Sequence, residues 1–270
     1  YVFEQQYLSE FEKEKFNILD KIKSIDNDIQ IIRRGRGYVP LPIWLKFKTE
    51  SKIFASGGDL KASFCLMAEN RAYMSQYFGD LENMDCYSSY ISNVDRMTDM
   101  FSIKADKYAC DMHPSYFSTR YTKSISQEPL QIQHHMAHIA SVIAEHGIEG
   151  DVLGFSFDGT GYGTDKTVWG GEVFEYKNNE FARKIHLKPV KMLGGDEISK
   201  NAETVLQCYF YDAGIDIDDQ LIKSALDMNI NTVKSSSMGR LFDAVSAILG
   251  ICDYNTYEGK CAVMLEIAAS

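Results

Sequence analysis

Three histidines within five residues are the strongest chemical feature of this sequence. The run Gln133–His138 reads Gln-His-His-Met-Ala-His. His134 and His138 are four residues apart, so on a helix both rings would face one side about 6 Å apart, as in a two-histidine metal clamp. Imidazole is a ligand for Fe, Zn and Ni. A pair of this spacing gives weak support alone, because histidines also occur at ordinary helix starts.

His135 would lie about 100° around the same helix, so it could not easily share that metal. It could contact a ligand phosphate, carry a proton, or form a hydrogen bond in the core. The sequence leaves these three roles open.

An acidic residue and a glycine-rich run follow an apolar strand. Asp158 comes directly after Val152–Phe157 and precedes Gly159-Thr160-Gly161-Tyr162-Gly163. A carboxylate at a strand end can face a site, and glycines let backbone N–H groups approach a phosphate. The run lacks the ending of a Walker loop, and a strand rather than a helix follows it, so a plain glycine hairpin is the alternative. Two histidines and one aspartate together have the composition of a catalytic mononuclear metal site.

Other glycine turns carry charged residues that could contact a nucleotide, although each also fits an ordinary turn. Lys61 follows Gly57 and Gly58 and could reach a phosphate or carboxylate. Acidic side chains that follow glycine pairs could hold ribose hydroxyls. These are Glu172 after Gly170-Gly171 and Asp196 after Gly194-Gly195, and Tyr257-Glu258-Gly259 is another tight turn. His113, within Asp111–Pro114 at a predicted strand end, is a separate candidate site residue. Ser235–Arg240 predicts an N-capped helix start.

The elements that must position these residues follow a β-β-β-α-β-α order that begins twice. In the first half we expect a three-strand meander, a helix and further elements: strands at 52–55, 62–68, 72–78 and 108–111, a helix at 81–98, and an element at 130–135 that opens into a helix through residue 145. In the second half we expect strands at 151–157, 167–176 and 180–187, then helices that include 261–269. Two such halves facing across a cleft would put ligands between them.

Before these halves, residues 1–32 show apolar positions near helical period and predict an amphipathic helix. Arg33–Pro42 is rich in Arg, Gly and Pro, which indicates a linker or boundary. Its arginines could also bind a phosphate.

Composition excludes several classes of protein. The chain has 270 residues, 45% apolar and 24% charged, which predicts an ordinary buried core. Its net charge of −10 argues against non-specific binding to nucleic acid or anionic membranes. It has no apolar run long enough for a membrane helix and no secretory pattern at its start. The six cysteines form no CxxC, so we expect neither a zinc ribbon nor a redox pair, and we predict a cytoplasmic protein.

Taken together, the motifs resemble the HypF-type carbamoyltransferases of [NiFe]-hydrogenase maturation. The resemblance covers roughly residues 33–266 in the order of the family. Its motifs are Gly57–Lys61, Tyr73–Glu82, Asp111–Tyr116, Gln133–Ala140, Phe157–Gly163, Trp169–Glu172, Gly194–Asp196, Ser236–Val245 and Tyr257–Gly259.

The resemblance implies carbamoyl transfer. Such enzymes use carbamoyl phosphate and ATP, with Mg for the ATP, and pass the carbamoyl group through carbamoyl-adenylate to the C-terminal cysteine thiol of HypE. His134, His138 and Asp158 match the ligands of a divalent metal, Fe or Zn. Lys61 and His135 would be catalytic through charge stabilisation. Nucleotide contacts are expected at Gly57, Gly58, Lys61, Asp158, Gly159, Thr160, Gly161, Gly163, Gly170, Gly171, Glu172, Gly194, Gly195, Asp196, Glu258 and Gly259.

The resemblance also implies an α/β fold of the actin/Hsp70/sugar-kinase type, related to TsaD-type proteins, with duplicated RNase H-like halves. We expect residues 1–45 to be an N-terminal segment and linker at the junction to a YrdC-like domain, 46–150 a first subdomain, and 151–270 a second one. The second subdomain is expected to be incomplete at its C-terminal end. The family's acylphosphatase-like and zinc-finger regions have no counterpart here.

Two other functions remain open at this stage. One is an O-carbamoyl- or threonylcarbamoyl-transferase with another acceptor. The other is a non-catalytic nucleotide-binding scaffold of the actin/Hsp70 type, which would not need the histidine pair.

Overall fold

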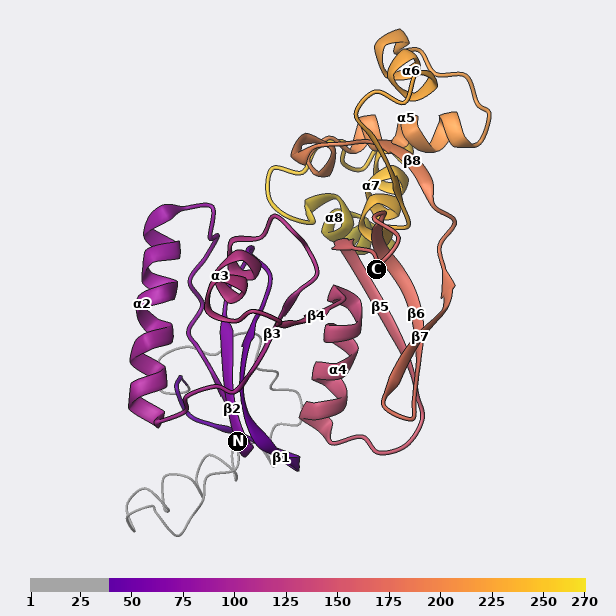
Figure 1. The fold of residues 1–270 in the computed structure, drawn as a ribbon. Coiled ribbons are helices and arrows are strands. Elements are labelled where there is room, and N and C mark those ends of the chain that lie inside the picture. The colour runs from indigo at the N-terminus through magenta and orange to yellow at the C-terminus, as the bar shows by residue number, and fades with distance from the viewer. Residues whose placement is uncertain (1–38) are drawn as a thin grey trace. The chain divides into compact units, whose positions relative to one another are not determined.

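The computed structural model describes residues 39–270, which form two compact α/β units (Figure 1). In the described chain, the first unit holds residues 39–132 and Ala144–Gly147, and the second holds Gln133–Ile143 and Ile148–Ser270. Each unit contains its own sheet, which confirms the predicted α/β class. The predicted helix at 1–32 and most of the Arg33–Pro42 linker lie outside the described residues. The expected domain bounds, 46–150 and 151–270, stay predictions.

The first unit contains a four-stranded sheet in the order β2-β1-β3-β4. β1 is antiparallel to β2 and parallel to β3, and β3 is parallel to β4. Helix α2 connects β2 to β3, and helix α3 connects β3 to β4 (Figure 1). The bounds are β1 Ile43–Ser56, β2 Phe64–Met74, α2 Met84–Phe101, β3 Lys107–Asp111, α3 Phe117–Ile125 and β4 Leu130–Ile132.

The predicted three-strand meander of this unit is wrong, because its second and third strands are one strand, β2. The expected turn at Glu69–Arg71 lies inside β2, where Glu69 has a φ of 55°. Pairing with β1 continues on both sides of it, through Thr49↔Glu69 and Trp44↔Arg71, with a shift of register. The polar residues therefore mark an irregularity in a long hairpin and not a chain reversal.

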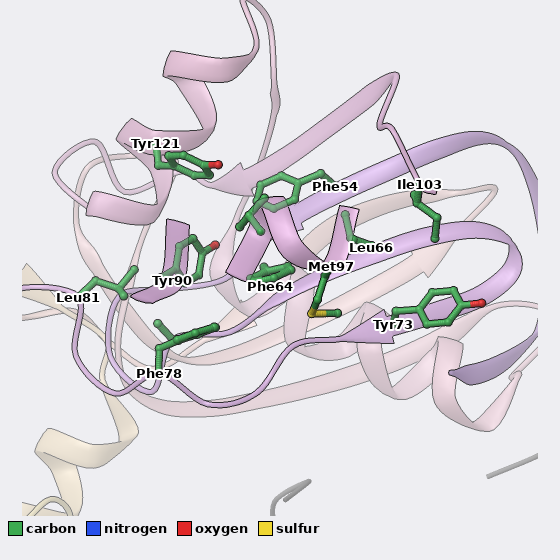
Figure 2. Packing of buried hydrophobic residues seen from close by; sticks show 12 residues of the cluster. Phe54, Phe64, Leu66, Tyr73, Phe78, Leu81, Tyr90, Met97, Ile103 and Tyr121 are labelled. Atoms are coloured by element: carbon green, nitrogen blue, oxygen red, sulfur yellow. The ribbon is translucent and has the colours of Figure 1, made fainter. Parts of the chain in front are cut away.

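Aromatic side chains fill the core between this sheet and its helices (Figure 2). Phe64 on β2 stacks on Phe78 with ring centroids 6.0 Å apart and meets Tyr90 of α2 edge to face. Phe54 on β1 contacts Tyr121 of α3. Since Tyr90 and Tyr121 also contact each other, α2 and α3 cover the same face of the sheet. Each such buried ring contributes roughly 1.5–3 kcal/mol relative to its exposed state.

The helix α2 illustrates how the sequence encodes these elements. Asn83 caps it by accepting hydrogen bonds from the backbone N–H groups of Asp85 and Cys86. Its buried residues Tyr90, Val94 and Met97 follow helical spacing, so one stripe faces the sheet.

The second unit has a five-stranded sheet in the order β5-β6-β9-β8, with β7 also paired to β6. β5, β6 and β7 form the antiparallel meander predicted for this half. The bounds are α4 His134–His146, β5 Val152–Tyr162, β6 Val168–Lys177, β7 Glu180–His186, β8 Val190–Leu193, the 3-10 helix Asp196–Ser199, α5 Ala202–Asp212, α6 Gln220–Asp227, β9 Thr232–Ser235, α7 Met238–Ile248 and α8 Lys260–Ala269.

Two predicted boundaries in this unit have different outcomes. The helix start at Ser235–Arg240 is confirmed, because Ser237 caps α7 and accepts a hydrogen bond from the backbone N–H of Arg240. The glycine run after Asp158 was expected to be a loop, but β5 continues through it to Tyr162. Pairing with β6 resumes at Gly161↔Trp169 after a register shift, so the glycines belong to an irregular strand.

Two apolar clusters hold the second unit together. Ile139 of α4 packs with Trp169 and Phe174 of β6, which places the first part of α4 against the meander. The other cluster joins β8, α5, α6 and α7 and is built around Met192, Val205 and Leu226. Among the described helices, none is both long and apolar enough to cross a membrane.

Candidate metal centre

The histidine run stands at the start of α4, and Gln133 sets that start. The Gln133 side-chain oxygen accepts hydrogen bonds from the backbone N–H groups of His135, at 2.8 Å, and Met136, at 3.1 Å. These N–H groups belong to the first turn and have no partner within the helix. The helix so begun places His134 and His138 on one side, with their Nε2 atoms 3.1 Å apart.

Asp158 reaches the same place from β5. Its Oδ1 accepts a hydrogen bond from the Gly159 N–H at 2.6 Å, which leaves Oδ2 for the histidines. Oδ2 lies 3.3 Å from His134 Nε2 and 4.0 Å from His138 Nε2. One ligand atom from each of these three residues lies within 4.8 Å of the others, so the structure brings together the three predicted metal ligands.

These distances fit a small divalent ion. Two ligands about 2.1 Å from a tetrahedral zinc ion lie about 3.4 Å from each other. The three ligand pairs of the cluster are 3.1, 3.3 and 4.0 Å apart. Two imidazoles and one carboxylate suit Zn or Fe and leave a coordination position for a substrate.

The charge state of the cluster also suits a metal. Burial raises the pKa of Asp158, but the hydrogen bonds from His134 and from the Gly159 N–H outweigh it, so the pKa lies below its ordinary value. Asp158 is therefore an anion at neutral pH and can act as a ligand. The side chains of the cluster differ in exposure, with 25% of His134, 31% of Asp158 and 57% of His138 exposed, so solvent reaches His138 most easily.

His135 is completely buried behind the cluster. Burial lowers the pKa of its ring to about 4, so the ring is neutral at physiological pH. Its Nε2 lies 3.7 Å from Asp158 Oδ2 and has no hydrogen-bond partner. Its predicted catalytic role stays a prediction, and full burial favours an action through Asp158 over contact with a substrate.

Two glycines of β5 allow α4 to approach this closely. A Cβ at Gly154 would lie 2.6 Å from Ile139, and a Cβ at Gly161 would overlap the ring of His135. A larger residue at either position would push the helix away from the strand. The start of α7 meets the other end of the glycine run, where the Ser237 hydroxyl donates to the Gly159 carbonyl oxygen at 2.7 Å.

Glu172, a predicted nucleotide contact, forms a buried network of hydrogen bonds within the protein. It is fully buried on β6 and accepts hydrogen bonds from Arg183 Nε, at 2.6 Å, and from the Ser236 hydroxyl. Burial raises its pKa, but these donors and the Gly170 N–H outweigh burial and lower it. Arg183 also lies over the Trp169 ring, 3.9 Å from its centroid. Glu172 thus joins β6, β7 and the segment before α7.

The remaining predicted nucleotide contacts stay predictions. In the first unit, Gly57 and Gly58 precede Asp59, whose buried carboxylate caps α3 through the N–H groups of Phe117 and Ser118. Lys61 is exposed in the turn that follows. In the second unit, four glycines of the set pack closely: Gly163 against Trp169, Gly170 and Gly171 against the segment of Ser236 and Ser237, and Gly194 against Asn231. The others lie next to helix starts: Gly195 and Asp196 at the 3-10 helix, and Glu258 and Gly259 before α8. Thr160 lies within β5.

Sequence reasoning assigned no role to two residues that organise the site. Gln133 was noticed only as part of the histidine run, although a polar residue directly before a helix start signals a cap. Arg183 had no local signal, because its partner Glu172 lies on the preceding strand.

Comparison with known proteins places this arrangement in a class. Residues 48–145 match the family described as the HypF Kae1-like domain. Residues 154–270 match the family described as the second subdomain of the carbamoyltransferase Kae1-like domain. Together they define a Kae1-like domain of the carbamoyltransferase class.

Individual relatives specify the family. The chain is 34% identical to the carbamoyltransferase HypF of Synechocystis sp. over 87% of the chain, and 32% identical to the probable carbamoyltransferase HypF of Methanocaldococcus jannaschii over 92%. It superimposes on a crystal structure of full-length HypF in the phosphate- and nucleotide-bound form, with a TM-score of 0.82 and 38% identity over 88% of the chain. For T. kodakarensis HypF the TM-score is 0.78, with 30% identity over 87% of the chain. The chain belongs to the HypF family.

The match covers this chain much more fully than it covers its relatives. The chain spans about a third of their length, 34% and 35% of the two curated proteins and 33% and 34% of the two solved structures.

Proposed function

We propose that this chain performs the carbamoyl-transfer step of a HypF enzyme. In this step a carbamoyl group passes from carbamoyl-adenylate to the C-terminal cysteine thiol of a HypE-type acceptor protein, for the cyanide ligand of [NiFe]-hydrogenase. The observation that carries the proposal is the cluster of His134, His138 and Asp158 in a Kae1-like domain of the HypF family. A non-catalytic scaffold would not need this cluster.

The proposed substrates and cofactors follow from the same family. Carbamoyl phosphate and ATP, with Mg, would yield the adenylate, and a divalent Fe or Zn ion would occupy the three-ligand cluster. A phosphate- and nucleotide-bound form is known for a HypF relative that is 38% identical. The proposed donor is itself a nucleotide, because its carbamoyl group is bound to the phosphate of AMP.

The chain's own residues bind and orient the donor in this proposal. The acceptor thiol loses its proton to solvent, the sulfur forms a bond to the carbamoyl carbon, and the bond from that carbon to the adenylate oxygen breaks, so AMP leaves with the electron pair. His134, His138 and Asp158 would hold the ion, which would supply Lewis-acid polarisation of the oxygen atoms of the donor. Backbone N–H groups of the run 159–163 and the Lys61 ammonium are the proposed stabilisers of the leaving phosphate. No protein nucleophile is required, since the partner supplies the thiol.

Metal content tests the cluster directly. We expect about one Fe or Zn per chain in the purified protein, and loss of this metal in the double variant His134→Ala/His138→Ala, because each substitution removes one of three ligands. Elemental analysis of the dialysed proteins measures it. The matched control is His146→Ala/His186→Ala, which removes two histidines outside the cluster and should leave the metal in place. Equal metal content in all three proteins would contradict the proposed site.

A second experiment tests the acceptor. Since the adenylate-forming domain is a separate part of the family's enzymes, it is added as a separate protein together with ATP, carbamoyl phosphate and HypE. Mass spectrometry of the C-terminal HypE peptide should then show one added carbamoyl group on its cysteine. The double histidine variant should give no added mass. If metal binds but the peptide stays unmodified, a hydroxyl acceptor becomes the better assignment.

A further inference from the structure

Gln133 and His135 form a hydrogen-bonded pair directly behind the ligand cluster. Both side chains are buried, with 2% of Gln133 and none of His135 exposed. The Gln133 amide nitrogen lies 3.1 Å from His135 Nδ1 and 3.3 Å from the carbonyl oxygen of Tyr162. Neither side chain is among the proposed ligands of the metal.

The backbone determines which way the Gln133 amide points. Its Oε1 faces the N–H groups of His135 and Met136, and a backbone N–H can only donate. The amide nitrogen must therefore be the atom that faces His135, and an amide nitrogen can only donate as well. The reverse orientation would place two donors against the two backbone N–H groups and bury all of them without acceptors.

This orientation selects one tautomer of His135. Because Nδ1 accepts a hydrogen bond from Gln133, it carries no proton. A ring without a proton on Nδ1 carries its one N–H on Nε2. That N–H has no hydrogen-bond partner. Its Nε2 lies 3.7 Å from Asp158 Oδ2, whereas the Nε2 of His138 lies 4.0 Å from the same oxygen.

A fully buried donor without an acceptor calls for an explanation, because leaving it unpaired costs free energy. Gly161 adds a second observation, since only a glycine leaves room for the His135 ring beside β5. The strand and the helix start are thus both built to hold an N–H group next to the carboxylate. In metal sites, groups that hydrogen-bond to ligands in this way orient them and tune their affinity.

We propose that Gln133 and His135 act as positioning residues: Gln133 fixes His135 as its Nε2–H tautomer, and that N–H orients the Oδ2 atom of Asp158 for metal binding. The proposal rests on the metal site of the proposed function. His135 then does not exchange a proton with the substrate, and its contribution is made through Asp158.

The tautomer can be measured without metal. In nitrogen-15 NMR of the metal-free full chain, the His135 signals should show a protonated Nε2 and an unprotonated Nδ1. Gln133→Glu keeps the oxygen that caps α4 but replaces the donor by an acceptor, so the proton should move to Nδ1. Gln131→Glu makes the same chemical change at an exposed position two residues earlier and should leave the His135 signals unchanged. An Nδ1–H tautomer in the wild type would overturn the proposal.

Metal affinity measures the consequence. Titration with Zn²⁺ or Co²⁺ should show a 10- to 100-fold weaker affinity for Gln133→Glu, the loss typical of such supporting groups, and no change for Gln131→Glu. A second pair of variants covers a failure of Gln133→Glu to fold. His135→Gln keeps a donor where Nε2 stood and should retain most of the affinity, whereas His135→Leu should lose it as Gln133→Glu does.

The outcomes separate the two proposals. Equal affinity in the wild type, Gln133→Glu and His135→Leu would overturn the positioning role and leave the metal site intact. If the wild type binds no metal, the proposed function fails at its cofactor, and the positioning of Asp158 for a metal fails with it. The wild-type tautomer then shows separately whether Gln133 donates a hydrogen bond to His135 Nδ1.

Discussion

At the scale of the residue, the three histidines of one run have different surroundings and hence different chemistry. His138 is more than half exposed, His134 is a quarter exposed and His135 is buried, although they lie within five residues. The i, i+4 spacing was enough to predict that His134 and His138 face one side. The burial of His135 depends on Gly161, a residue of another element, so no local pattern could assign its role.

A substitution at Gly161 tests this close approach. A Cβ in Gly161→Ala would overlap the buried His135 ring, so we expect the free energy of unfolding to fall by about 1–3 kcal/mol. Metal affinity should fall with it, because the ring must move away from Asp158. Urea denaturation measures the first effect and zinc titration the second.

Gly159→Ala is the matched control in the same strand. Its Cβ would meet nothing nearer than Arg240 at 3.9 Å, and the backbone there has no positive φ. It should change stability by less than about 0.5 kcal/mol. Equal losses in both variants would mean that the strand tolerates no side chain at all, and that His135 is not the reason.

At the scale of the element, the second unit depends on contacts between strand and helix ends. β5 carries Asp158 and the glycine run, and the starts of α4 and α7 contact this stretch through His134 and Ser237. Glu172 of β6 connects Arg183 of β7 with Ser236 next to α7. The helix and strand types were predictable from periodicity and caps, but the connection through Glu172 joins residues whose spacing has no pattern.

The pH dependence of stability tests the Glu172 network. Glu172→Gln leaves Arg183 without its buried counter-charge, so we expect a loss of about 3 kcal/mol in the free energy of unfolding at pH 7. The folded-state pKa of Glu172 is below its ordinary value of 4.5, so the charge stabilises the fold above pH 4.5. This contribution disappears as the pH falls from 4.5 through the lowered folded pKa. The difference between wild type and variant should therefore shrink over that range in urea denaturation.

Glu175→Gln is the control for this experiment. Glu175 lies on the same strand and pairs with Lys184 at 2.9 Å, but its side chain is 41% exposed. Surface pairs of this kind contribute little, so the variant should stay within about 1 kcal/mol of the wild type at neutral pH. A Glu172→Gln variant as stable as Glu175→Gln at pH 7 would show that the buried pair makes no net contribution.

At the scale of the whole molecule, the described chain consists of two units with separate apolar cores. The aromatic cluster of Phe54, Phe64 and Tyr90 lies wholly in the first unit (Figure 2). The clusters around Ile139 and Met192 lie wholly in the second. The chain spans about a third of the length of its HypF relatives.

Separate cores predict separate responses to core mutations. Phe64→Ala removes a fully buried ring and should destabilise the first unit by about 3–5 kcal/mol. We expect hydrogen–deuterium exchange to rise in β1, β2 and α2 while β5 and β6 keep their protection. Phe47→Ala, at an exposed position of β1, is the control and should leave exchange unchanged. An equal rise in β5 and β6 would show that the two units unfold as one.

The sequence by itself determined the features that depend on neighbours along the chain. These are the face shared by His134 and His138, the apolar strand that leads to Asp158, the cap at Ser237 and the α/β class, because periodicity and capping act within a few residues. Only the tertiary structure decided that the glycine run is a strand, that His135 is buried against Gly161, and that Glu172 pairs with Arg183. Those outcomes depend on which distant segment packs against each residue. Local sequence patterns do not determine the free energy of such long-range contacts.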